Sequence, residues 1–205
     1  MKIKMILSAA MAIAAVLPQV ASAGFILDTG TPPPPGLSPP SLDATDWYAA
    51  KFTVGAGETI TSLSAYLLQG SGEPGNTFTW DLYSASGPFT GANRELPTLS
   101  TTGTYHSNGW NSTTVDWSVT PGQYWIALQV SGATETPGLE LPTEASTTSG
   151  TVPAAAFAYA GTNGRYAIET NNPFGVEVTA VPLPAAAWLL ASGLASLGFG
   201  ARRRQ

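Results

Sequence analysis

TFTWDLYS, residues 77–84, carries the clearest structural signal in this chain of 205 residues. Phe78, Trp80 and Leu82 alternate with threonine, aspartate and tyrosine, so apolar and polar side chains take opposite faces of an extended chain. A period of two over eight residues is typical of a β-strand with one face on a hydrophobic core. The alternation therefore predicts a strand here, with Asp81 on a solvated outer face.

Similar strand-like segments lie on both sides of residues 77–84, separated by turn sequences such as Gly55–Gly57 and Pro121–Gly122. The predicted strands are Trp47–Val54, Thr59–Gln69, Leu96–Tyr105, Thr113–Val119, Gln123–Val130, Ala154–Ala160, Tyr166–Glu169 and Phe174–Ala180. The same region has no amphipathic helical pattern of normal length. Short strands with recurrent turns predict an all-β fold, an antiparallel β-sandwich of the jelly-roll or Ig-like type.

The first 23 residues have the pattern of a secretory signal peptide. Two lysines precede an apolar run over residues 6–17, and small residues at Ala21 and Ala23 form a cleavage site that leaves Gly24 as the new N-terminus. A first transmembrane helix is the less favoured alternative, because the apolar run is short for one. The pattern predicts export through the Sec machinery and removal by signal peptidase.

Residues 24–42 precede the predicted strands and include TPPPPGLSPP at residues 31–40. Consecutive prolines favour an extended polyproline conformation. We therefore expect residues 24–42 to form a Pro-rich spacer and residues 43–180 to form the folded ectodomain, a length suited to one domain.

The charge of residues 24–180 is strongly acidic, with three basic residues against 13 acidic ones for a net charge of −10. Such a surface argues against nucleic acid as a partner and is compatible with neutral glycans or cations. The chain has no cysteine, so an exported domain of this kind depends on burial of apolar surface for stability.

The C-terminal stretch, residues 181–205, has three consecutive parts. Val181, Pro182, Leu183 and Pro184 come first, an uncharged run of 16 residues from Ala185 to Gly200 follows, and Arg202, Arg203 and Arg204 come last. As a helix, 16 residues span about 24 Å, and the basic side chains extend that reach toward the ~30 Å of a bilayer core. This pattern predicts a transmembrane helix over residues 185–201 with its arginines on the cytoplasmic side. A buried apolar helix in a soluble protein is the alternative.

This arrangement resembles the PEP-CTERM sorting signal of Gram-negative bacteria, in a variant with VPLP as its motif and Leu183 where the usual glutamate stands. The resemblance covers residues 181–205. It implies processing by an exosortase, transient anchoring in the inner membrane, and then release to the cell surface or extracellular matrix. It also implies an association with exopolysaccharide and biofilm. Sequences with this signal often carry a β-rich ectodomain.

The ectodomain shows little sign of catalytic chemistry. His106 is the only histidine and lies in a predicted exposed turn, and no recognised nucleophile, phosphate or dinucleotide motif is present. We therefore expect no catalytic residues, no metal and no cofactor, and a protein that is not an enzyme. The alternative is a secreted jelly-roll hydrolase acting on polysaccharide through two carboxylates. Its candidate carboxylates are Asp81, Asp116, Glu169 and Glu177.

Aromatic residues are the most suggestive feature of the ectodomain, because aromatic rings stack on sugars. Trp80, Trp117 and Trp125 follow strand periodicity and are expected in the core. Trp110 lies among polar residues and is the candidate glycan platform. Asn111 begins a glycosylation sequon, which we interpret as a chance match.

Overall fold

The computed structural model describes residues 22–32, 41–42, 46–84, 96–130, 138–142, 150–160, 166–169 and 173–183. This part of the chain is all-β and its strands pair antiparallel, which confirms the predicted fold class at that level. The remainder of the predicted signal peptide, Pro184, the predicted helix over residues 185–201 and Arg202–Arg204 lie outside the described residues. None of the described residues forms a helix that is long and apolar enough to cross a membrane.

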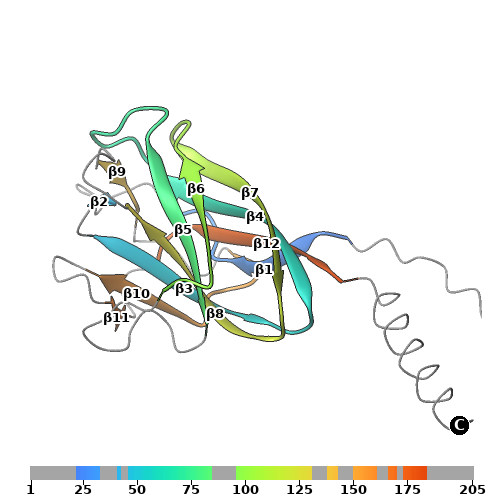
Figure 1. Cartoon of the computed structure of the whole chain (residues 1–205). Coiled ribbons are helices and arrows are strands. Elements are labelled where there is room, and N and C mark those ends of the chain that lie inside the picture. Colours follow the sequence, from blue (N-terminus) through green and yellow to red (C-terminus); the bar gives the residue numbers. More distant parts are fainter. Residues whose placement is uncertain are drawn as a thin grey trace, which may run out of the picture. The chain divides into compact units, whose positions relative to one another are not determined.

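Two larger sheets and one small ladder organise the described strands (Figure 1). The four-stranded sheet has the order β1 (Gly24–Asp28), β12 (Val176–Pro182), β4 (Glu58–Leu67) and β7 (Gly109–Val119). The six-stranded sheet has the order β11 (Tyr166–Glu169), β10 (Ala156–Ala160), β3 (Trp47–Val54), β8 (Gly122–Gln129), β5 (Thr77–Ser84) and β6 (Leu99–Thr104). The ladder pairs β2 (Ser41–Leu42) with β9 (Leu139–Glu140).

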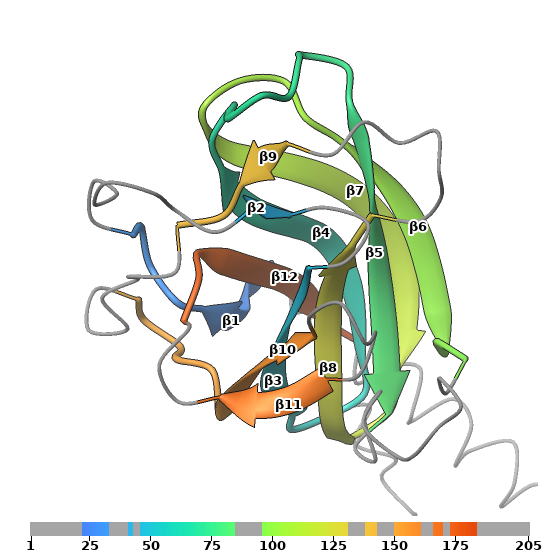
Figure 2. The same cartoon turned by 90° about the vertical axis from the view of Figure 1, so that its left-hand side faces the viewer.

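The main hydrophobic core is built from residues of both larger sheets, whose arrangement Figure 2 shows. Phe78, Trp80 and Leu82 of β5 are 0 % exposed, so the alternation of this strand correctly predicted its inner face. From the opposite sheet, β4 contributes Ile60 and Leu63 to the same core. The Trp80 indole N–H donates a hydrogen bond to Thr113 Oγ1 at 3.2 Å, which satisfies the one polar group that this large side chain buries.

The first strand differs from the sequence prediction. Residues 24–28 were expected to belong to a spacer, but they form β1 and pair with β12, with Gly24 opposite Ala180 and Asp28 opposite Glu177. Leu27 is fully buried in the main core. The physical reason is that β4 pairs with only one side of β12. Without β1, the backbone groups on the other side of β12 would have no strand to pair with. Strand pairing therefore begins at Gly24, before the predicted domain boundary at residue 43.

Candidate functional site

The outer face of the four-stranded sheet carries a continuous row of polar side chains. Register places Asp28 of β1 beside Glu177 of β12, Glu177 beside Ser64 of β4, and Ser64 beside Ser112 of β7. The two serine hydroxyls are hydrogen-bonded at 2.8 Å. We call this set, together with Trp110 and Tyr66 at one end of it, the outer polar face.

Asp28 is a buried carboxylate whose oxygens are occupied by donors from two loops. Oδ1 accepts from the Gly30 N–H at 2.9 Å, and Oδ2 accepts from the Thr151 N–H at 2.8 Å and the Thr151 hydroxyl at 2.7 Å. Burial acts to raise the pKa of Asp28, but these hydrogen bonds together hold the pKa below its ordinary value. Asp28 is therefore an ionised anchor that ties β1 to the chain around residue 151.

Glu177 lies directly beside Asp28, and its pKa is shifted in the opposite direction. Burial raises the pKa of Glu177, and the negative charge of Asp28 raises it further. Lys51 is the only lysine or arginine in the described ranges, and it lies on β3 of the other sheet. Two adjacent carboxylates whose pKa values move apart are a pattern that acid–base catalysts also use. Of the four candidate carboxylates from the sequence, only Glu177 belongs to this pair.

Trp110 lies at the start of β7, opposite Tyr66 of β4. The two rings meet edge to face, with centroids 5.7 Å apart and an interplanar angle of 86°. The Trp110 indole N–H donates to Thr31 Oγ1 at 3.2 Å. Trp110 and Tyr66 are both half-buried, so part of each ring remains available on the outer polar face. The sequence prediction identified Trp110 but missed Tyr66, whose alternation along β4 from Ser62 and Ser64 was the available signal.

The six-stranded sheet has a second apolar cluster on the side away from the main core. It contains Trp47, Ala49, Tyr83, Trp125, Ala127, Ala158 and Ala160. Trp80 and Trp117 pack in the main core as expected, whereas Trp125, only 2 % exposed, packs in this second cluster. Lys51 Nζ lies 5.7 Å from the centroid of the Trp125 ring. These aromatic side chains are therefore packing residues rather than an open platform.

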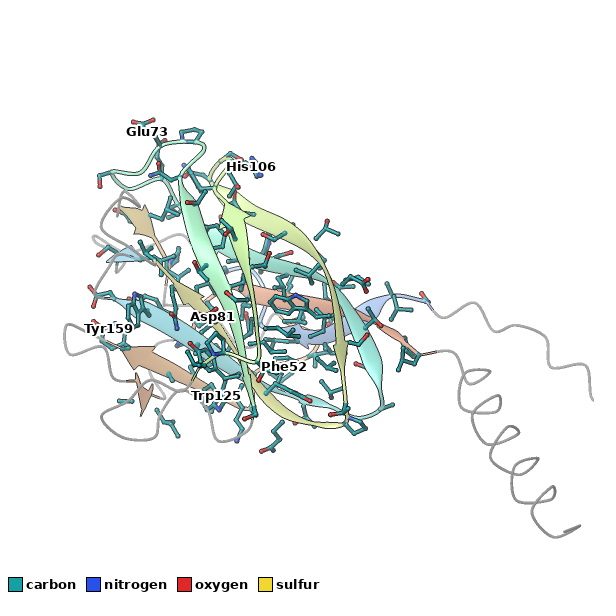
Figure 3. The ribbon with its side chains drawn as sticks, viewed as in Figure 1. Phe52, Glu73, Asp81, His106, Trp125 and Tyr159 are labelled. Atoms are coloured by element: carbon teal, nitrogen blue, oxygen red, sulfur yellow. The ribbon has the colours of Figure 1, made fainter. Side chains whose placement is uncertain are left out.

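The prediction that Asp81 lies on a solvated face is wrong, because its side chain is buried and only 6 % exposed. Its strand does turn it away from the main core, but the second apolar cluster lies on that side (Figure 3). The Tyr83 hydroxyl donates to Asp81 Oδ2 at 3.4 Å and accepts from Gln129 Nε2 at 3.0 Å. Asp116 is exposed on β7, so these two candidate carboxylates lie on different sheets.

His106 is exposed in the loop before β7, as predicted, and Figure 3 shows it at the same end of the domain as Glu73 and away from Trp125. The neighbouring Asn111 side chain is buried and organises this loop. Its Oδ1 accepts from the His106 N–H at 2.7 Å, and its Nδ2 donates to the carbonyls of Ser107 and Gly109 at 2.9 Å each. This use of the amide supports the interpretation of the sequon as a chance match. Within the described ranges, no three histidine, aspartate or glutamate residues are grouped as a metal would require.

The two predicted processing regions lie at the same end of the four-stranded sheet, where β1 begins and β12 ends. Ala23 is exposed and precedes β1, which begins at Gly24. Val181 and Pro182 are the last residues of β12, and the Leu183 N–H donates to the Gly57 carbonyl at 3.1 Å. Ala21 and Pro184 fall outside the described residues. Comparison with protein-family models and with curated proteins finds no match for this chain.

Proposed function

We propose that this chain is an exported, exosortase-sorted protein of the cell surface or extracellular matrix, with a non-catalytic β-sandwich of jelly-roll or Ig-like type that associates with exopolysaccharide. The inner membrane holds it transiently through residues 185–201 before processing. Signal peptidase, the Sec machinery and an exosortase are its processing partners.

One observation carries this proposal: strand pairing begins and ends where the two targeting segments meet the domain. β1 starts at Gly24, the residue that the cleavage pattern makes the new N-terminus, and β12 runs into the VPLP motif. Gly24 pairs with Ala180, so the chain enters and leaves the domain at the same end of the same sheet (Figure 1). Removal of residues 1–23 and of the residues after Pro182 would leave the strands intact.

The outer polar face supports the association with polysaccharide. It offers the exposed hydroxyl group of Ser112, which is hydrogen-bonded to the buried Ser64, beside the partly exposed rings of Trp110 and Tyr66. Sugars are bound by hydrogen-bonding groups next to aromatic surfaces. The adjacent Asp28 and Glu177 have no basic partner among the described residues of this sheet, which favours an uncharged glycan over an anionic one.

Mass spectrometry of the protein from cells with and without an exosortase tests the sorting proposal. With the enzyme, the mature chain is expected to start at Gly24 and to lack Arg202–Arg204. Without it, the chain is expected to keep the arginines and to fractionate with the inner membrane. A chain that stays in the cytosol with residues 1–23 attached would refute the proposal.

Binding to purified exopolysaccharide tests the role of the outer polar face. Trp110→Ala is expected to weaken binding roughly tenfold or more, in line with loss of one stacking aromatic. Ile168→Ala is the matched control, because Ile168 is exposed on β11 of the other sheet. Equal binding by the two variants would exclude Trp110 as a platform.

A second candidate function, a polysaccharide hydrolase, has one observation in its favour, the adjacent carboxylates of Asp28 and Glu177 with oppositely shifted pKa values. The three hydrogen bonds that Asp28 accepts from Gly30 and Thr151 give it a structural role instead. Release of reducing ends from polysaccharide by the wild-type chain, and loss of that release in Glu177→Gln, would establish the hydrolase.

A further inference from the structure

The final described residues, Val181–Leu183, are held against β4 as a continuation of the four-stranded sheet. Register pairs Val181 with Thr59 and Pro182 with Glu58, and the Leu183 N–H donates to the Gly57 carbonyl at 3.1 Å. Three of the four residues of the VPLP motif are thus part of the fold rather than a free peptide beyond it. This feature deepens the proposed function and rests on it.

The alternation of a strand determines toward which neighbour each backbone N–H and C=O group of Val181–Leu183 points. In an antiparallel pair, every second residue directs both its N–H and its C=O toward the same neighbour. Leu183 bonds to Gly57, the residue before β4, so Val181, two residues earlier, directs its backbone groups toward β4 as well. Pro182 directs its carbonyl the opposite way. Proline has no N–H, so it is tolerated at an outward-facing edge position and removes the one donor that position would offer.

The opposite edge of this segment is not covered by β1. Pairing between β1 and β12 starts with Gly24 beside Ala180, and the preceding residues Ser22 and Ala23 are exposed and belong to no strand. A partner strand approaching Val181–Leu183 from this side would therefore meet the Pro182 carbonyl and no N–H group. Ordinary strand addition to a sheet edge needs donors and acceptors in alternation.

We propose that Val181–Leu183 is a recognition strand masked by β4, and that its partner is a peptidase that binds an extended peptide through main-chain hydrogen bonds. Two sets of groups that this partner needs are already engaged in the folded domain: the backbone of Val181, which is paired with Thr59 of β4, and the N–H of Leu183, which donates to the Gly57 carbonyl. Recognition requires the last three residues of the segment to separate from β4 while the rest of β12 stays paired. Local opening of a strand end is a common low-energy fluctuation, so β4 slows recognition without preventing it.

A reversible cross-link tests this inference in the full chain. Thr59→Cys with Val181→Cys would join the segment to β4, and antiparallel partners lie within disulfide range. The chain has no cysteine of its own that could compete for pairing. Ser62→Cys with Thr179→Cys is the matched control, since it joins the same two strands upstream and leaves Val181–Leu183 able to open. Thiol labelling establishes the oxidised fraction of each variant before the assay.

Each purified chain is incubated with exosortase-containing membranes, with and without reductant, and loss of Arg202–Arg204 is followed by mass spectrometry. We expect the chain with the oxidised Thr59–Val181 cross-link to be processed at roughly a tenth of the rate of its reduced form, or more slowly still. The chain with the oxidised control cross-link, Ser62–Thr179, is expected to be processed at the same rate as its own reduced form. The wild-type chain with and without reductant shows any effect of the reductant on the enzyme.

Two outcomes would overturn the inference: equal processing of the oxidised and reduced Thr59–Val181 pair, or equal slowing by both cross-links, which would mean that all of β12 must open. Failure of the proposed function looks different, because then no chain is processed, the wild type included, and the inference falls with it. Amide hydrogen exchange gives a second measurement: slow exchange at Val181 and Leu183 is expected, and exchange at the rate of a free peptide would contradict masking.

Discussion

Replacement of Asp28 by asparagine tests whether this carboxylate anchors β1. Its Oδ1 accepts one hydrogen bond, from Gly30, and its Oδ2 accepts two, from the backbone N–H and the hydroxyl of Thr151. Asparagine is nearly the same shape but has one acceptor oxygen and one NH₂ group. With its oxygen kept on Gly30, its NH₂ faces the N–H and the hydroxyl of Thr151, so both charge-assisted bonds are lost, and the hydroxyl can at best turn to accept a weaker, neutral bond from the NH₂.

The expected loss follows from the two bonds. A hydrogen bond to a charged group contributes about 1.5–3 kcal/mol, and a buried donor left unpaired costs about 1–3 kcal/mol. Removing a buried charge beside Glu177 offsets part of this loss. We therefore expect Asp28→Asn to lower the free energy of unfolding by about 2–4 kcal/mol at neutral pH. For a domain of this size, that corresponds to a melting temperature roughly 4–16 °C lower.

The pH dependence gives the prediction a definite sign. Because the pKa of Asp28 is lowered in the folded state, its stabilisation is complete above the unfolded value of about 4 and is lost as pH falls through the folded pKa. The difference between wild type and Asp28→Asn should therefore be largest near pH 7 and should shrink below about pH 4. Urea unfolding of residues 24–183 in both forms, followed by tryptophan fluorescence between pH 3 and pH 8, measures it.

Glu177→Gln is the matched control, because the ionised carboxylate of Glu177 is predicted to lower the stability of the fold, whereas that of Asp28 raises it. The pKa of Glu177 is raised by burial and by Asp28, so its charged form destabilises the fold as pH rises through the folded pKa. Glu177→Gln should be neutral or stabilising near pH 7 and should match wild type below about pH 4. If Asp28→Asn were as stable as wild type at pH 7, or if its deficit grew in acid, the anchoring role of Asp28 would be refuted.

Four further substitutions test the packing and the loop geometry by thermal unfolding. Asn111→Ala should lower stability by about 2–4 kcal/mol, because it removes three or more hydrogen bonds from a buried amide; a change below about 0.5 kcal/mol would contradict that role. Gly103→Ala should cost about 1–3 kcal/mol, since its Cβ would lie 2.6 Å from the Phe78 ring, and an unchanged melting temperature would mean that the ring moves freely. Trp80→Ala should cost about 3–5 kcal/mol and Trp110→Ala much less, because Trp80 is fully buried and Trp110 is not; the reverse order would refute the assignment of their environments.

Alternation predicted the direction of side chains well because it is a local property of one strand. The ranges of β3, β5 and β11 coincide with the predicted strands, and Phe78, Trp80 and Leu82 all reach the main core. The strand β1 escaped prediction because its existence depends on a partner about 150 residues away in the chain. Nothing in GFILD distinguishes an edge strand from the start of a spacer until β12 is known to lie beside it.

Burial of Asp81 was missed for a different reason: alternation gives the direction of a side chain but not what lies in that direction. The sequence did contain a signal in the neighbouring strand. In β8, Trp125 and Ala127 take one face while Ile126 and Leu128 take the other, so both faces are apolar. Apolar residues on both faces are typical of strands buried on both sides. A carboxylate on the adjacent strand β5 would then be expected to be buried as well.

The place of β12 in the sheet connects stability with processing. It is the last of the described strands, yet it lies between β1 and β4, so the four-stranded sheet cannot be completed until residues 176–182 are free to pair. If the chain is exported as proposed, that happens only after these residues have left the export machinery. Pairing over such a long separation is slow relative to local contacts. Until β12 pairs, β4 does not mask Val181–Leu183, and a peptidase that reads this segment would act fastest on incompletely folded chains. A destabilised variant such as Asp28→Asn should then lose Arg202–Arg204 faster than wild type in a pulse–chase experiment. Slower loss would show that the enzyme recognises the paired strand, and that β4 presents the motif instead of hiding it.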